Sequence, residues 1–200
     1  DTRGVPPALA GTAQPFEYNN LDSLRAALAA NRGRVACIIM EAARGKQPAP
    51  GFLEGVRALC DEHGAVLIFD EVVTGFRLAL GGAQEYFGVT PDLCTFAKAL
   101  SNGIPLGAVC GRREVMQSAA TMFVSSTYFS DTLGLAAGLA TVQTLRDEPV
   151  LPHVWAMGER LQDGLRALAD RHGIAFHCDG FPPVLHMGFD EADEHQRIVM

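Results

Sequence analysis

The stretch Ala65-Val-Leu-Ile-Phe-Asp-Glu71 decides the fold: an apolar run that ends in two carboxylates. Five consecutive apolar residues between Gly64 and the acidic pair predict a strand buried on both faces. A second apolar run covers 35–40, and between the two runs residues 52–63 carry apolar side chains at helical spacing, with Gly64 as the stop. Strand, helix and strand in this order predict an α/β domain with a mostly parallel sheet flanked by helices.

The same alternation continues along the chain. Asn20 or Asp22 can cap a helix over 21–31, and Leu161, Leu165 and Leu168 are expected on the inward face of a long helix. The remaining predicted elements are strands at 92–96, 106–110 and 184–189, and helices at 133–145 and 154–172. The prolines at 149 and 152 mark a predicted boundary. Residues 1–148 then form part of a large domain, and 149–200 form a connecting helix and the start of a smaller one.

Composition excludes several classes of protein. The 200 residues carry 23 acidic and 16 basic side chains, a net charge of -7, which argues against binding nucleic acid or an anionic membrane. No apolar run reaches the roughly 18 residues of a membrane span. The five cysteines are widely spaced and form no C-x-x-C, as is typical of buried, reduced thiols. No signal peptide is visible, so a cytoplasmic protein is expected.

Asp70 and Glu71 lie where parallel α/β sheets bind ligands, at the carboxyl end of a strand. One interpretation is a nucleotide-binding, ATPase-like domain in which this pair holds magnesium. Its phosphate loop would read G-x-x-x-x-G-K-[ST], and neither Lys46 nor Lys98 stands in that pattern. Another interpretation is an acidic pair that merely caps a turn.

The chain has only two lysines, Lys46 and Lys98, so few amines could act as a nucleophile. Lys98 follows the predicted strand 92–96, and we expect it to be partly buried at the edge of the sheet. Burial disfavours the charged form of a lysine, and a neutral amine can form a Schiff base. A lysine whose amine simply reaches solvent is the alternative. A lysine together with the strand-end Asp70 suggests pyridoxal 5'-phosphate (PLP) chemistry.

Three motifs strengthen this interpretation. Leu67-Ile-Phe-Asp-Glu-Val-Val-Thr-Gly-Phe-Arg77 resembles the cofactor-aspartate motif of class-III PLP-dependent aminotransferases. The stretches Gly81-Gly-Ala-Gln-Glu-Tyr-Phe-Gly-Val-Thr-Pro-Asp92 and Phe96-Ala-Lys-Ala-Leu-Ser-Asn-Gly-Ile-Pro-Leu-Gly-Ala108 resemble that family's approach to its Schiff-base lysine. The first of these two is most similar to the glutamate-1-semialdehyde 2,1-aminomutase branch. The resemblance covers most of 35–145 and implies PLP-dependent transferase fold type I, which is aspartate-aminotransferase-like.

The resemblance also implies roles for individual residues. Lys98 matches the catalytic lysine that holds the cofactor, Asp70 the partner of the pyridine nitrogen, and Val72 the apolar residue that packs on the ring. Val73 stands where other branches often have Gln, so a contact to the ring hydroxyl must come from elsewhere. Arg77 is expected to be structural.

Two further residues follow from the same resemblance. Thr127 matches the threonine that binds the cofactor phosphate, usually of the partner subunit, which implies a homodimer with shared active sites. The neighbouring residues Ser130, Asp131 or Thr132 can cap the helix that follows. Glu41 matches a residue at the substrate entrance, although Ala42 replaces the usual proline after it.

The predicted activity moves an amino group between a small-molecule donor and a carbonyl acceptor, an aldehyde or ketone. The acceptor is expected to be glutamate-1-semialdehyde-like or an aldehyde of an amino sugar or secondary metabolite. No metal site is expected, because the six histidines lack zinc spacing. Family members are longer than this chain, which predicts a fragment of a full enzyme. A non-catalytic, truncated relative is the alternative.

Overall fold

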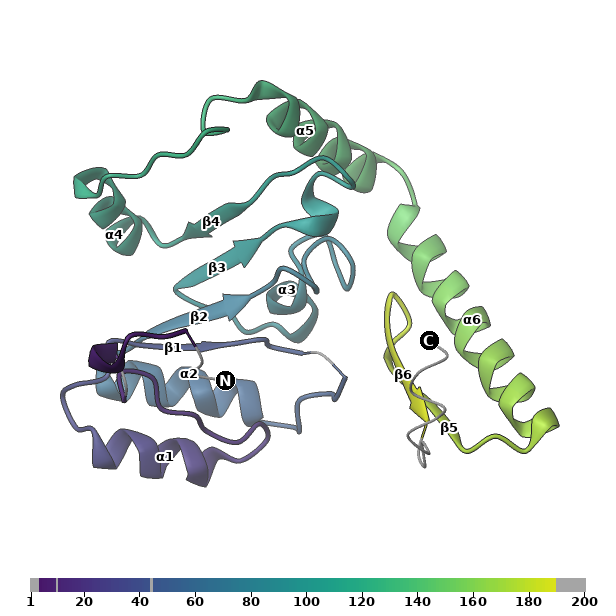
Figure 1. Cartoon of the computed structure of the whole chain (residues 1–200), viewed down its shortest axis with the longest axis horizontal. Coiled ribbons are helices and arrows are strands. Elements are labelled where there is room, and N and C mark those ends of the chain that lie inside the picture. Colours follow the sequence, from purple (N-terminus) through teal and green to yellow (C-terminus); the bar gives the residue numbers. More distant parts are fainter. Residues whose placement is uncertain (1–3, 10, 44, 190–200) are drawn as a thin grey trace. The chain divides into compact units, whose positions relative to one another are not determined.

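The computed structural model describes residues 4–9, 11–43 and 45–189 (Figure 1). The chain divides into two compact units, one of residues 1–38 and 48–67 and the other of residues 39–47 and 68–200. Strands β1 (Cys37–Met40) and β2 (Val66–Asp70) contribute residues to both units. Among the described residues, no helix is both long and apolar enough to cross a bilayer. The predicted division at 148/149 stays a prediction.

The first unit contains the short 3-10 helix η1 (Pro7–Leu9) and helices α1 (Leu21–Ala30) and α2 (Phe52–His63). The side chain of Asn20 caps α1 by accepting a hydrogen bond from the Ser23 N–H at 3.0 Å. Helix α2 has the predicted bounds, because Gly64 takes up the left-handed backbone that ends it. Gly55 lets α1 approach closely, since a Cβ there would lie 2.4 Å from a methyl carbon of Leu21.

The second unit contains most of the remaining elements. Their bounds are α3 (Ala83–Phe87), β3 (Leu93–Phe96), η2 (Lys98–Leu100), β4 (Ala108–Gly111), α4 (Arg113–Met116), η3 (Gln117–Thr121), α5 (Thr132–Asp147), α6 (Val150–His172), β5 (Phe176–Phe181) and β6 (Val184–Phe189). Asp131 caps α5 by accepting a hydrogen bond from the Leu133 N–H at 3.0 Å.

The main sheet has the strand order β1-β2-β3-β4, and the predicted α/β class is confirmed. Strand β2 pairs with β3 in parallel, as expected of a strand–helix–strand unit. Strand β4 instead runs antiparallel to β3. The reason is the connection over 97–107, whose only helix is the one-turn η2, whereas a parallel return needs a longer crossover.

Helix α6 presents a different face to its neighbours than predicted. Leu161 and Leu168 were expected to point inward, yet they are 51% and 49% exposed, and Leu165 is only half-buried. Its buried positions are Gly158, Gln162 and Ala169. The partner of that face is the β5–β6 hairpin, of which only β6 was predicted. Strand β5 was not predicted because its sequence, Phe176-His-Cys-Asp-Gly-Phe181, contains polar residues and a glycine, which are uncommon in strands.

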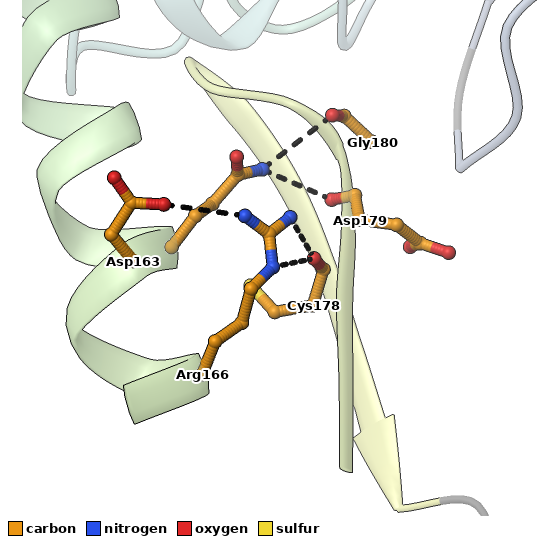
Figure 2. Close-up of polar contacts among 6 residues, drawn as sticks. Asp163, Arg166, Cys178, Asp179 and Gly180 are labelled. Carbon is orange, nitrogen blue, oxygen red and sulfur yellow. Dashed lines mark hydrogen bonds and ion pairs between the residues drawn. The ribbon is translucent and has the colours of Figure 1, made fainter. Parts of the chain in front are cut away.

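Figure 2 shows how α6 holds the hairpin. The Arg166 Nε–H donates to the carbonyl oxygen of Cys178 at 3.0 Å, and the second guanidinium donor binds the same oxygen. The Gln162 side-chain amide reaches the carbonyls of Asp179 and Gly180 at 3.3 and 3.5 Å. Polar side chains on α6 therefore satisfy backbone carbonyls of β5, and this explains why a non-leucine face is the buried one.

Four aromatic rings join α3, α6 and β5 within the second unit. Tyr86 stacks on Trp155 with ring centroids 5.6 Å apart, and Phe181 meets Tyr86 and Phe87 edge-on at 5.8 and 5.9 Å. The Trp155 Nε1–H donates to the carbonyl of Leu78 at 3.2 Å. This cluster fixes the segment between β2 and β3 against the long helix.

The cysteines differ partly from expectation. All five cysteines are free thiols, but Cys37 and Cys110 are exposed rather than buried. His177 and His186 lie on β5 and β6, and their rings stack at 5.9 Å. Within the part of the chain that the structure describes, no three His, Cys, Asp or Glu side chains are grouped to hold a metal. His195 lies outside the described residues.

Candidate active site

Asp70 is held by two donors at the carboxyl end of β2. Its register partner on β3 is Thr95, whose hydroxyl donates to Asp70 Oδ1 at 3.2 Å. The backbone N–H of Val72 donates to the same oxygen at 3.0 Å. The carboxylate is half-buried and fixed at the edge where parallel sheets bind ligands. Thr95 was not singled out from sequence, although aligning the two strand ends would have placed it opposite Asp70.

Lys98 lies three residues beyond Thr95, at the carboxyl end of the neighbouring strand. Its backbone has φ = 46°, in the left-handed region that costs energy for any residue with a Cβ. Such strain gathers at functional sites, where the surroundings hold it in place. The prediction of a partly buried lysine is wrong for this chain, because Lys98 is exposed.

The turn after Lys98 is nevertheless well held. Ser101 is only 3% exposed, and its hydroxyl donates to the carbonyl of Ile104. The backbone N–H of Asn102 donates to the carbonyl of Lys98 at 3.1 Å. Asp70 and Lys98 therefore stand at the ends of two paired strands, each in a locally fixed backbone.

Val72, Val73 and Arg77 form the loop that leaves β2. Val72 and Val73 are half-buried. The Arg77 guanidinium donates to the carbonyl of Val73 at 2.7 Å, and burial lowers the pKa of this arginine. A half-buried arginine bound to backbone favours the predicted structural role.

Glu71 does not share a ligand site with Asp70. It is fully buried, and its two carboxylate oxygens accept hydrogen bonds from the backbone N–H groups of Ala83 and Gln84, both at 2.8 Å. The Thr74 hydroxyl donates to one of the same oxygens. These hydrogen bonds occupy the Glu71 carboxylate, so it is not available as the second magnesium ligand that the ATPase-like interpretation requires.

The two remaining candidate site residues, Glu41 and Thr127, lie outside the segments that carry Asp70 and Lys98. Glu41 directly follows β1 and is half-buried. Thr127 lies in an exposed turn before α5. Around it, five large apolar side chains are exposed: Met122, Phe123, Val124, Tyr128 and Phe129.

Comparisons of the sequence and of the fold with known proteins point to the same family. The family model of class-III aminotransferases matches residues 8–177. The chain is 29% identical to the FumI protein of Sphingopyxis sp. MTA144, solved in its PLP internal aldimine form, with a TM-score of 0.84 over 89% of this chain and 44% of that one.

Two further solved structures represent different reactions. The β-phenylalanine aminotransferase of Variovorax paradoxus is 29% identical, with a TM-score of 0.75 over 92% of this chain and 46% of its own. The glutamate-1-semialdehyde aminomutase of Pseudomonas aeruginosa PAO1 is 26% identical, with a TM-score of 0.75 over 94% of this chain and 45% of its own. The chain therefore spans less than half the length of these solved structures.

Proposed function

Since the chain belongs to the class-III aminotransferase family, we propose that it is the cofactor-binding part of a PLP-dependent enzyme that transfers an amino group to or from an aldehyde or ketone. The observation that carries the proposal is the pair formed by Asp70 and Lys98 at the ends of the paired strands β2 and β3. The ends of parallel strands are where α/β folds bind ligands.

The residues present suit PLP. Asp70 offers a carboxylate whose Oδ1 is already fixed by Thr95 and Val72, so the group is oriented before a ligand arrives. The exposed amine of Lys98 is free to meet an aldehyde. Val72 supplies a half-buried apolar side chain for the face of a ring. An acid, an amine and an apolar surface are the groups that a pyridinium aldehyde requires.

Bound PLP would supply the sink for the electrons released when a substrate C–H bond breaks. Lys98 would hold the cofactor's aldehyde carbon through Nζ and, once displaced by the substrate amine, accept and return the proton as general base and acid. Asp70 would pair with the protonated pyridine nitrogen and keep it charged. Thr95 and the Val72 N–H would hold that carboxylate in place.

For substrates, we propose a small-molecule amino donor and an aldehyde or ketone acceptor. The stretch Gly81-Gly-Ala-Gln84 supports glutamate-1-semialdehyde-like chemistry, and an amino-sugar or secondary-metabolite aldehyde is the second candidate. An aminotransferase and an aminomutase, each named above, are similar to this chain to nearly the same extent, so the choice between their reactions needs experiment.

We also propose a homodimer in which Thr127 binds the cofactor phosphate of the partner subunit and Glu41 lines the substrate entrance. The support is the exposed apolar segment around Thr127, which continues into Leu133, Leu135 and Leu139 of α5. A large exposed apolar surface is typical of an interface.

The test is spectroscopic and kinetic, on the full-length protein. Bound to a lysine, PLP absorbs at roughly 410–430 nm, and we expect this band in the purified enzyme. Turnover of the carbonyl acceptor should then be measured with and without L-glutamate. Dependence on the donor identifies a transaminase, and turnover of an amino-aldehyde without any donor identifies an aminomutase. If the band is absent after PLP has been added, the proposal fails.

A further inference from the structure

Glu71 is the most completely buried charged side chain among the described residues, and the mechanism above does not use it. Its exposed fraction is 0%, and its carboxylate has three donors. Oε1 accepts from the Gln84 N–H and Oε2 from the Ala83 N–H, each at 2.8 Å, while the Thr74 hydroxyl also binds Oε2. Both oxygens are therefore needed, and only a carboxylate accepts on both.

The chain is shaped to admit this carboxylate. Gly82 has φ = 79°, and a Cβ at this position would lie 2.4 Å from Glu71 Oε2. A side chain at residue 82 would thus collide with the acid and strain the backbone. The Glu71 carboxylate and the close approach that Gly82 allows together hold the end of the loop 71–84 against the end of β2.

That closed loop touches both strands that carry the candidate catalytic pair. The backbone N–H of Glu71 donates to the Thr95 carbonyl at 3.0 Å, and its own carbonyl accepts from the Gly75 N–H at 2.8 Å. Gly75 lies directly against the ring of Phe96, since a Cβ there would be 2.5 Å from it. The ring of Phe76 also meets Phe96 at 5.3 Å. Phe96 stands two residues before Lys98.

We propose that Glu71 is a positioning residue for the cofactor, on the basis of the proposed function. By closing the loop 71–84 it sets the backbone of Asp70 and Val72 on one side and supports Phe96, before Lys98, on the other. It touches no reacting atom. Loss of the carboxylate leaves the Ala83 and Gln84 N–H groups facing an amide, opens the loop and loosens the orientation of Asp70.

The test compares Glu71→Gln with Glu85→Gln in the full-length protein. Glu85 is the matched control, because it is an exposed carboxylate that binds the Gly81 N–H of the same loop. Three quantities are measured: the PLP dissociation constant, the pH midpoint of the visible band, and hydrogen exchange of residues 71–75 and 83–87 without cofactor. For Glu71→Gln we expect binding weakened by about tenfold, a shifted midpoint and faster exchange. Glu85→Gln should stay within about twofold of wild type.

If Glu71 only stabilised the loop, a different combination of results would be expected. If Glu71→Gln exchanges faster at 83–87 but keeps the wild-type PLP affinity and band midpoint, the positioning role is wrong. If Glu71→Gln fails to fold, Thr74→Val removes one hydrogen-bond donor to Glu71, and Thr74→Ser, which retains it, is the control. A wild-type PLP affinity and band midpoint in Thr74→Val would then overturn the proposal. Absence of the visible band in the wild-type enzyme would instead contradict the proposed function, so the two failures are distinguishable.

Discussion

Asp70 and Glu71 are adjacent in sequence but have different partners in the structure. Asp70 binds the Thr95 hydroxyl and the Val72 N–H at the sheet edge, while Glu71 turns into the protein and binds α3. The sequence predicted two acids at a strand end and matched Asp70 to a family role. The sequence could not distinguish the role of Glu71 from that of Asp70, because two of the three donors to Glu71 lie 12 and 13 residues away on a helix of only five residues.

At this residue scale, Gly82→Ala should destabilise the protein. The added methyl group meets the buried Glu71 carboxylate and forces a residue with a Cβ to φ = 79°, at a cost of about 1–3 kcal/mol. Urea denaturation of the full-length protein should show a lower midpoint. Gly81→Ala is the control, because its Cβ would approach most closely the flexible end of the exposed Glu85 side chain, at 2.9 Å from Oε2, and the Cβ of Glu85 at 3.2 Å. Equal midpoints for both variants would contradict the account of the Glu71–Gly82 contact.

At the scale of elements, the sequence predicted correctly the features that depend on neighbouring residues, such as helix bounds and helix caps. Helix α2 was predicted from end to end by its spacing and its terminal glycine, and the α1 cap is Asn20, one of its two predicted candidates. The buried face of α6 was mispredicted, because leucines at helical spacing usually point inward. Here the contact is with backbone carbonyls of β5, which polar side chains and a glycine suit better.

Substituting two glycines of α6 by alanine tests that packing, because the two variants are expected to change stability in opposite directions. A Cβ on Gly158 would lie 2.1 Å from the carbonyl oxygen of Pro182, so Gly158→Ala should lower the urea midpoint, at a cost of about 1–3 kcal/mol. A Cβ on Gly164 would meet nothing within 4 Å. Gly164→Ala should therefore raise the midpoint, because alanine favours a helix by about 0.5–1 kcal/mol over glycine. An unchanged or higher midpoint for Gly158→Ala would show that α6 does not pack on the hairpin through Gly158.

At the scale of the molecule, the α/β class followed from the alternation of strands and helices and the family from three motifs, whereas the surroundings of the site could not be predicted from either. Lys98 was expected to be partly buried and is exposed. Thr127 and its apolar neighbours are likewise exposed. The solved structures with which the chain aligns are about twice its length.

We propose that Lys98 carries the cofactor and that Asp70 pairs with its pyridine nitrogen, and borohydride reduction is the sharpest test of this assignment. Borohydride fixes PLP to the lysine that holds it, and mass spectrometry of the digested full-length protein then identifies that residue. Within this chain only Lys46 and Lys98 can react, so Lys46→Ala and Lys98→Ala are a matched pair. We predict a pyridoxyl adduct on Lys98 that survives Lys46→Ala and disappears in Lys98→Ala. An adduct on Lys46, or labelling that persists in Lys98→Ala, would contradict the account.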